Sequence, residues 1–431
     1  MPHNFKTDYI FVAQFLILSI SKKAIFMKNF KILFLFSLLC SNCIHQTKKV
    51  EDSNIKEIDI NKNLSNTQEI NLSAIASSIE YCVLETDEKC LVTPAMSVYC
   101  TEEYVVTIGG NQGHAGCYVF ERKTGKFVRQ ISNYGRGPEE YTEIVSFWDG
   151  VNEQICVFGN NQFLFFNMDG TLSHKTNRFK HWMWHFVAYE DFYVGYTPNR
   201  FGDNTIRIAF YDKTGAFIDS IPNYRTWKRT QTWFSGGGDS WLYVFNNAVY
   251  FKEIYSDTLY HIKDFALYPR YVFNTGGRAV PYEIQEGGRY DVIGSLRKKG
   301  KVDDRYEKYL IILKIFENNK HLYFTIEYRE QLYPAIYDKT EDRLQIISPI
   351  SIPPIGRDWK IPLYGFTNDL DGGLPFWPQQ MISDKEMMRV YTAEELLELD
   401  VSKITDPKLK NLLNSIDIES NPVVAIITLN H

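Results

Sequence analysis

The sequence lacks the short patterns that mark most catalytic and metal sites. After residue 43 no Cys-x-x-Cys pair occurs, and no spacing of cysteine and histidine matches a structural zinc site. The nucleophile pattern G-x-S-x-G, the phosphate-binding pattern G-x-x-x-x-G-K-[ST] and the metalloprotease pattern HExxH are also absent. We therefore expect neither a metal ion nor a cofactor, and the sequence indicates no established catalytic class.

Long apolar runs and a basic surface are missing as well. The apolar stretches Tyr9–Ile20 and Ile32–Leu39 are shorter than the roughly 20 residues of a membrane-spanning helix. The formal net charge is -5, from 47 Lys and Arg against 52 Asp and Glu, so we expect no nucleic-acid partner. Cysteine is scarce, with 7 residues in 431, and those after residue 43 are expected to be mostly small buried side chains.

The N-terminal region has the pattern of an export signal. Met27–Lys31 carries positive charge, Ile32–Leu39 is apolar, and a serine and an asparagine precede Cys43. We interpret residues 1–42 as a signal and targeting segment, with Met27 as an alternative start. Cys43 is then the lipidated residue of a bacterial outer-membrane lipoprotein, and a plain secretory peptide is the alternative. Residues 43–68 are mostly polar and are expected to form a flexible tether.

Aromatic residues are abundant, at 15%, and they favour the half-buried surface of β-sheets. Three segments repeat a pattern of strand, turn and strand, with turn glycines at Gly125, Gly170 and Gly215, 45 residues apart. Glycine supplies the positive φ that a tight turn requires. A repeat of this length with several strands per unit indicates a β-propeller.

Two looser copies of the hairpin follow at residues 258–273 and 334–347, with an insertion at 276–302 between them. Five hairpins leave a sixth blade to be built from the ends of the chain. Ile79–Leu84 is therefore expected to pair with the C-terminal strand at 422–429, which removes an exposed sheet edge. The predicted fold is an all-β, six-bladed β-propeller over residues 69–431, closed by N- and C-terminal strands.

A short helical insertion is predicted within the last blade. Thr392 and Glu395 form a capping-box pattern, and Asp406-Pro407 places proline at the first helical position. The leucines that follow each start are spaced to dock the helices on the blade. Residues 393–415 are therefore expected to form one or two short helices.

The loop Tyr134–Tyr141, YGRGPEEY, resembles a G-x-G-P-G-E-Y segment of the six-bladed β-propeller lipoproteins of Bacteroidetes, which are related to the NHL-repeat propellers. Glu139 stands where that family usually has glycine. Segments at 71–86, 257–271 and 368–378 resemble the family's opening strand, middle blade and last blade, so the resemblance covers about residues 71–431. It implies a propeller of the cell envelope and little about activity.

Two classes of function remain open. The first is a lipid-anchored binding or scaffold protein of the cell envelope, whose partner is a glycan, a peptide or another protein. The alternative is a propeller enzyme of the lactonase, lyase or glycan-active type, with a His/Arg site at the channel mouth. There His181 or His185 would act as base or ligand, and Arg136 or Arg200 would hold an anion.

The candidate ligand-binding residues lie in three places. The first is the segment 180–186, expected to be a strand, where Trp182 and Trp184 would offer stacking surfaces and His181 and His185 hydrogen bonds. The second is the pair of arginines Arg136 and Arg200, which could hold an anion. The third is a loop rich in glycine and proline that carries Trp377. Each place also has a purely structural explanation. This is a packed inner strand for the segment 180–186, solvated charges for the arginines and a structural turn for the loop with Trp377.

Overall fold

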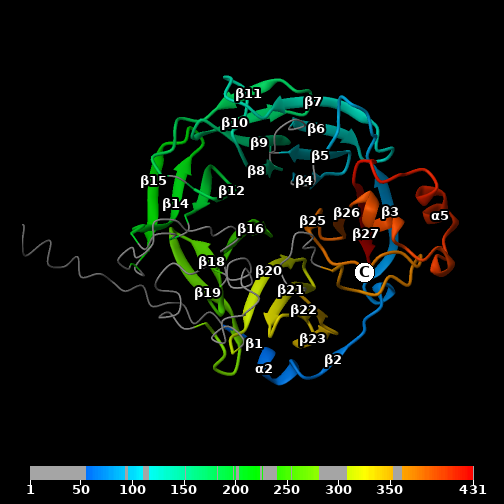
Figure 1. Cartoon of the computed structure of the whole chain (residues 1–431). Coiled ribbons are helices and arrows are strands. Elements are labelled where there is room, and N and C mark those ends of the chain that lie inside the picture. The colour runs from blue at the N-terminus through cyan, green and yellow to red at the C-terminus, as the bar shows by residue number, and fades with distance from the viewer. Residues whose placement is uncertain are drawn as a thin grey trace, which may run out of the picture. The chain divides into compact units, whose positions relative to one another are not determined.

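Six β-sheets stand around a central axis in the computed structural model (Figure 1). The structure describes residues 55–92, 96–109, 116–150, 152–181, 183–197, 199, 203–223, 226, 240–253, 255–280, 308–352 and 362–430. The compact unit that they form begins at Ile55. The predicted all-β, six-bladed β-propeller is confirmed.

Each blade is built on four antiparallel strands, and we number the blades along the chain. From the innermost strand outward, blade one consists of β4 (Met96–Cys100), β5 (Tyr104–Gly109), β6 (Gly116–Glu121) and β7 (Phe127–Asn133). Blade two consists of β8 (Glu143–Asp149), β9 (Gln154–Gly159), β10 (Gln162–Asn167) and β11 (Leu172–Lys175). Blade three consists of β12 (His185–Tyr189), β13 (Phe192–Tyr196), β14 (Ile206–Asp212) and β15 (Phe217–Pro222).

Blades four to six follow the same plan. Blade four consists of β16 (Ser240–Phe245), β17 (Ala248–Glu253), β18 (Thr258–Lys263) and β19 (Ala266–Asn274). Blade five consists of β20 (Ile311–Glu317), β21 (His321–Tyr328), β22 (Gln331–Asp338) and β23 (Arg343–Ile347), with β24 (Ile350–Ser351) beside β22. Blade six consists of β25 (Gln380–Met381), β26 (Glu386–Tyr391), β27 (Val423–Leu429) and β3 (Ala76–Val83).

The repeated glycines occupy the turns between the two outer strands of blades one to three, as predicted. Their φ angles are 71° at Gly125, 88° at Gly170 and 84° at Gly215. Blade four makes the equivalent turn without glycine, since Asp264 and Phe265 adopt φ angles of 49° and 57°. The loss of glycine from the fourth copy therefore did not remove its hairpin.

Two of these glycines allow a matched test of the turn. A Cβ added at Gly125 would lie 1.8 Å from the carbonyl oxygen of Val83, whereas at Gly170 the nearest atom would be 3.7 Å away. Both substitutions by alanine incur the left-handed backbone penalty of about 1–2 kcal/mol. We expect Gly125→Ala to lower the free energy of unfolding clearly more than Gly170→Ala, as measured by urea denaturation. Equal losses would contradict the close approach of this turn to β3.

The ring closes through the two ends of the chain. β3 pairs antiparallel with β27, from Ala76 opposite Leu429 to Val83 opposite Val423. β3 is thus the outermost strand of a blade whose other three strands come from the C-terminal part of the chain. The predicted pairing of Ile79–Leu84 with the C-terminal strand is confirmed.

Residues 55–68 correct the prediction of a tether that continues to residue 68. β1 (Lys56–Asp59) adds in parallel to β19, and β2 (Thr67–Gln68) adds in parallel to β23. The short helix α2 (Ile60–Asn63) lies between them, and Ile58 and Ile60 are fully buried. The sequence of this segment does not predict strands, because it contains few apolar residues. The strands that β1 and β2 pair with belong to the blades and are distant in sequence.

The predicted helical insertion lies between β26 and β27. It contains α4 (Ala393–Leu397), the 3-10 turn η3 (Val401–Lys403) and α5 (Pro407–Leu413), and a second 3-10 turn, η1 (Leu72–Ala74), precedes β3. Both expected helix starts are present, with the capping box of Thr392 and Glu395 and with Asp406 as N-cap. Leu396 and Leu409 are buried as expected, whereas Leu397 is exposed.

Neighbouring blades are joined by apolar packing and by partly buried ion pairs. The aromatic cluster between blades two and three is an example, with Phe163 only 4.3 Å from Phe186 between ring centres. The first and last blades are joined by Arg122, whose two terminal nitrogens lie 2.6 and 3.1 Å from the carboxylate of Glu386. The five cysteines of the described residues are free and buried, in line with the prediction.

Candidate functional site

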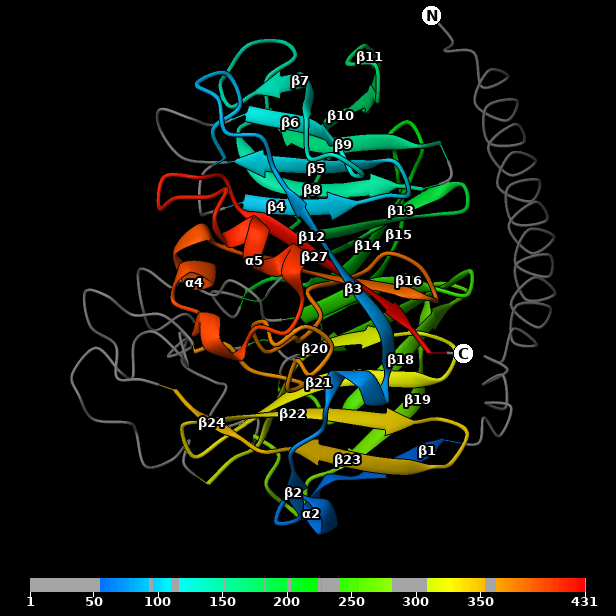
Figure 2. The ribbon, with the colours of Figure 1, turned by 90° about the vertical axis from the view of Figure 1, so that its right-hand side faces the viewer.

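The two faces of the ring differ in their connections. At the face where the innermost strands end, neighbouring strands are joined by short turns, from the two residues 190–191 to the five residues 122–126. From β3 onward, every connection longer than five residues lies at the opposite face, which includes α4 and α5 (Figure 2). We call these the turn face and the loop face. Binding sites of scaffold folds concentrate on such loops, so the loop face is the candidate functional surface.

Arg136 lies on the loop face, in the connection from β7 to β8. Its side chain is exposed. The loop around it is held by Glu140, whose carboxylate accepts a hydrogen bond from the Gly137 nitrogen at 2.6 Å. A Cβ at Gly135 would lie 2.1 Å from an oxygen of that carboxylate. The two glycines of the motif therefore make room for a glutamate that fixes the turn, while Arg136 projects from it.

The segment 180–186 does not form the single strand predicted for it, because β12 begins only at His185. His181 lies near the outer strands of blade three, where its ring is 5.5 Å from that of Phe217 on β15. Met183 is fully buried, and Trp184 is half-buried with its backbone N–H donating to the Tyr196 carbonyl. The two histidines are therefore separated, and the segment leads from the outside of the ring to its centre.

His185 is the member of this segment that reaches the centre of the ring. Burial and, to a smaller extent, the charge of Lys314 lower the pKa of its imidazole to about 4, while a hydrogen bond to the backbone of Ser240 acts in the opposite direction. His185 belongs to blade three and Lys314 to blade five, which are not neighbours in the ring. Their electrostatic interaction therefore acts across the central opening.

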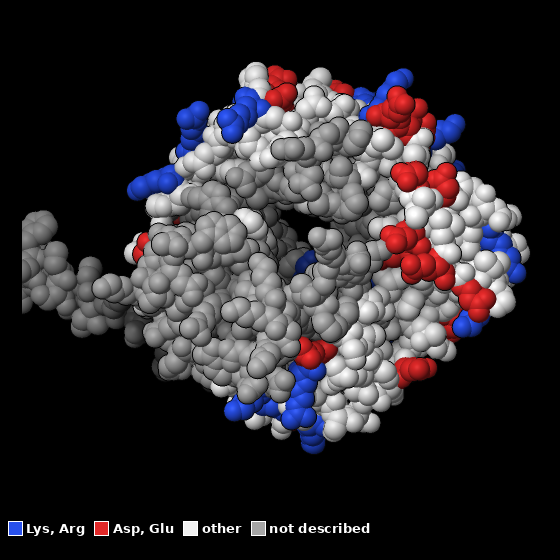
Figure 3. All heavy atoms as spheres, in the orientation of Figure 1, with Lys and Arg blue, Asp and Glu red and all other residues white. Residues whose placement is uncertain are grey.

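Lys314 and Trp241 complete this group, and sequence reasoning missed both. The Lys314 ammonium lies 5.3 Å from the centre of the Trp241 ring, and Lys314 is exposed although its surroundings lower its pKa. Exposure together with a lowered pKa is expected for a side chain that water reaches inside an opening surrounded by protein. Figure 3 shows basic atoms at the central opening of the ring. We call His185, Ser240, Trp241 and Lys314 the channel group.

A second charged group at the boundary of blades four and five is fully satisfied. The buried carboxylate of Glu317 accepts two hydrogen bonds from Arg270, at 2.7 and 2.8 Å. It accepts one more at 2.8 Å from Tyr243 and one at 2.8 Å from Lys339. This network therefore has a structural explanation, and the channel group has no comparable carboxylate among the described residues.

Trp377 lies in the core between blades five and six. It is 3% exposed and packs near Tyr323 and Phe366, with ring centres 6.3 and 5.6 Å away. The structure thus gives this side chain a packing role. Trp182, Arg200 and Cys43 lie outside the described residues.

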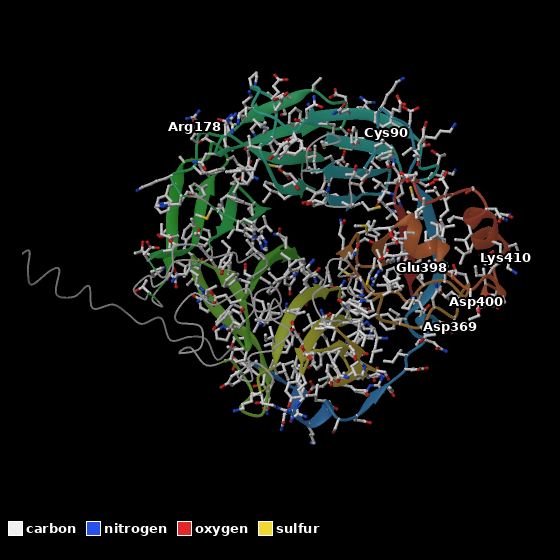
Figure 4. All side chains as sticks on the ribbon, in the orientation of Figure 1. Cys90, Arg178, Asp369, Glu398, Asp400 and Lys410 are labelled. Carbon is white, nitrogen blue, oxygen red and sulfur yellow. The ribbon has the colours of Figure 1, made fainter. Side chains whose placement is uncertain are left out.

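The carboxylates of the loop that precedes Trp377 do not converge. Asp369 accepts hydrogen bonds from the nitrogen and hydroxyl of Ser73, at 2.9 and 2.5 Å, and lies on the outer part of blade six (Figure 4). Asp371 is buried, and its carboxylate accepts the Gly373 N–H instead. Among the described residues, no three or more side chains of His, Cys, Asp or Glu are grouped to hold a metal ion.

The arrangement of the blades places the chain in the class of six-bladed β-propellers. Residues 55–428 match the family described as Domain of unknown function (DUF4934), and the protein belongs to that family. No curated protein sequence matches the chain. The relation to NHL-repeat propellers stays a prediction.

Two solved structures are similar in fold. A presumed exported protein from Bacteroides fragilis NCTC 9343 has a TM-score of 0.60 and 17% identity, with 87% of this chain and 100% of that chain covered. A member of the DUF4221 family from Bacteroides vulgatus ATCC 8482 has a TM-score of 0.46 and 12% identity, with 85% and 99% covered. In the described part of this chain, no helix has the length and apolar character needed to cross a membrane.

Proposed function

We propose that the protein is a lipid-anchored binding protein of the bacterial cell envelope, which holds a glycan, a peptide or a partner protein at its loop face. The observation that carries the proposal is the asymmetry of the ring. One face is closed by short turns, and the other carries the long connections and opens on the channel group. The exported description of the Bacteroides fragilis protein supports an envelope location.

The path of the N-terminal segment supports an orientation as well. β1 runs parallel to β19, which begins at the turn face, and the Lys56 ammonium donates to the carbonyl of Lys339 in a turn of that face. The chain therefore enters the ring from the turn face. The 12 peptide links between Cys43 and Ile55 span at most roughly 40 Å when extended. With lipid on Cys43, the turn face is nearest the membrane and the loop face points away.

The anchor is tested by substitution of the two cysteines of the signal region in the full chain. We expect Cys43→Ala to abolish labelling by radioactive palmitate and to release the protein from the membrane fraction. Cys40→Ala is the matched control and should leave both unchanged. Labelling that persists in Cys43→Ala, or is lost in Cys40→Ala, would contradict the assigned lipidation site.

Binding is tested with the detergent-solubilised full chain on glycan and peptide arrays. We expect at least one ligand to bind. Substitutions in the channel group should abolish its binding, and substitutions in the short turns of the turn face should leave its binding unchanged. Binding that depends on the turn face instead would contradict the proposal.

A further inference from the structure

The channel group has a positive charge without a carboxylate to balance it in the described part of the chain. Lys314 is an exposed residue of the innermost strand of blade five, and its ammonium lies over the ring of Trp241. Burial and the charge of Lys314 together lower the pKa of the His185 imidazole to about 4. The imidazole is therefore neutral near pH 7, and the group carries one positive charge.

Two unpaired hydrogen-bond donors lie on adjacent residues of the innermost strand of blade four. The Ser240 hydroxyl oxygen and the Trp241 indole nitrogen are both buried without a hydrogen-bond partner among the described residues. Buried donors that stay unpaired cost free energy and make the local potential more positive. The edge of the Phe316 ring, 5.4 Å from Trp241 between ring centres, holds the indole in place.

Two other lysines indicate what distinguishes Lys314. Lys252 lies opposite Trp241 on the neighbouring strand, but it is 1% exposed and donates to the Glu253 carbonyl at 2.6 Å. Lys339 donates to the buried carboxylate of Glu317 at 2.8 Å. Lys252 and Lys339 therefore each donate to an oxygen atom of the protein. The exposed Lys314 has no such acceptor among the described residues.

We propose that the central opening binds a small organic monoanion through Lys314, with the carboxylate of the ligand taking the place that Glu317 takes in the neighbouring network. One cation beside a neutral imidazole matches a single carboxylate better than a doubly charged phosphate. The inference rests on the proposed binding function, because it names the class of ligand for the same face. Arginine, tyrosine and lysine around Glu317 supply the internal example of carboxylate recognition.

The test uses the full chain in detergent and a panel of glucuronate, lactate and benzoate, with glucose as the neutral counterpart of glucuronate. Calorimetric titrations are made at constant ionic strength. We expect at least one carboxylate to bind and Lys314→Gln to weaken its binding by about tenfold or more, as for loss of one charge-assisted hydrogen bond. Lys213→Gln is the matched control, because Lys213 also lies over an aromatic ring, 4.7 Å from the centre of Tyr193.

A second readout tests the geometry without any ligand. In Lys314→Gln the pKa of His185, followed by NMR of its imidazole, should rise from about 4, because one of the groups that lower it is gone. An unchanged pKa, or carboxylate binding that is equal in wild type and Lys314→Gln or absent throughout the panel, would overturn the inference. If a neutral ligand binds the loop face equally well with and without Lys314, the inference fails while the proposed function stands. If no ligand binds the loop face at all, both fail.

Discussion

A chain that begins at Thr86 should fail to fold, although it retains 24 of the 27 strands of the described residues and loses only β1, β2 and β3. Without β3, the strand β27 becomes a sheet edge, and six of its seven residues are buried in the closed ring. Side chains such as Leu72 and Leu84 contribute about 1.5–3 kcal/mol each when fully buried. Their loss removes much of the roughly 5–15 kcal/mol by which a domain is stable.

Two longer chains are the controls for this truncation. A chain that begins at Ser53 keeps β1, β2 and β3 and should fold with the full cooperativity of the ring. A chain that begins at Glu69 lacks β1 and β2 but keeps the closing strand, so it should fold with a lower melting temperature. Circular dichroism and thermal melting of the three soluble fractions distinguish these outcomes. A folded, cooperative chain from Thr86 would contradict closure by β3.

Glu317→Ala should lower the free energy of unfolding by about 3–5 kcal/mol, the usual cost of leaving buried charges without their partner. The substitution removes the carboxylate that pairs with Arg270 and Lys339, both of which are largely enclosed between blades four and five. Urea denaturation followed by fluorescence measures the loss.

Glu341→Ala is the matched control for this ion-pair network. Glu341 and Arg343 also form an ion pair at 2.9 Å, but their side chains are 55% and 58% exposed. Solvent screens such a pair, and its removal should cost less than about 1 kcal/mol. Similar losses in the two variants would mean that the Glu317 network is not buried as described.

Local patterns predicted the blades because each hairpin carries its own signal. Gly125, Gly170 and Gly215 adopt the positive φ that their spacing implied, and Thr392 and Asp406 cap the helices that follow them. The closing strand was predicted by a topological argument, since a sheet edge left open in a ring is unfavourable. These features depend on neighbours in sequence or on a general property of the fold.

The channel group depends instead on blades that are distant in sequence. Lys314 lies in the strand IILKIFE, and nothing in that stretch distinguishes it from a lysine on a solvated strand face. It becomes notable because the ring brings it to His185 of blade three and Trp241 of blade four. The separation of His181 from His185 was missed for a similar reason, because β12 begins later than the aromatic pattern suggested.

Disulfide trapping between β3 and β27 is a direct test of ring closure. Ser78 and Thr428 lie directly opposite each other on β3 and β27, and both are only partly buried. If β3 closes the ring, Ser78→Cys with Thr428→Cys forms a crosslink on mild oxidation. Ser78→Cys with Glu386→Cys should not, because Glu386 lies opposite Thr428 on the next strand, about 10 Å from Ser78 and beyond disulfide reach. The reverse result, or no crosslink in a folded protein with the first pair, would contradict a ring closed by the N-terminal strand.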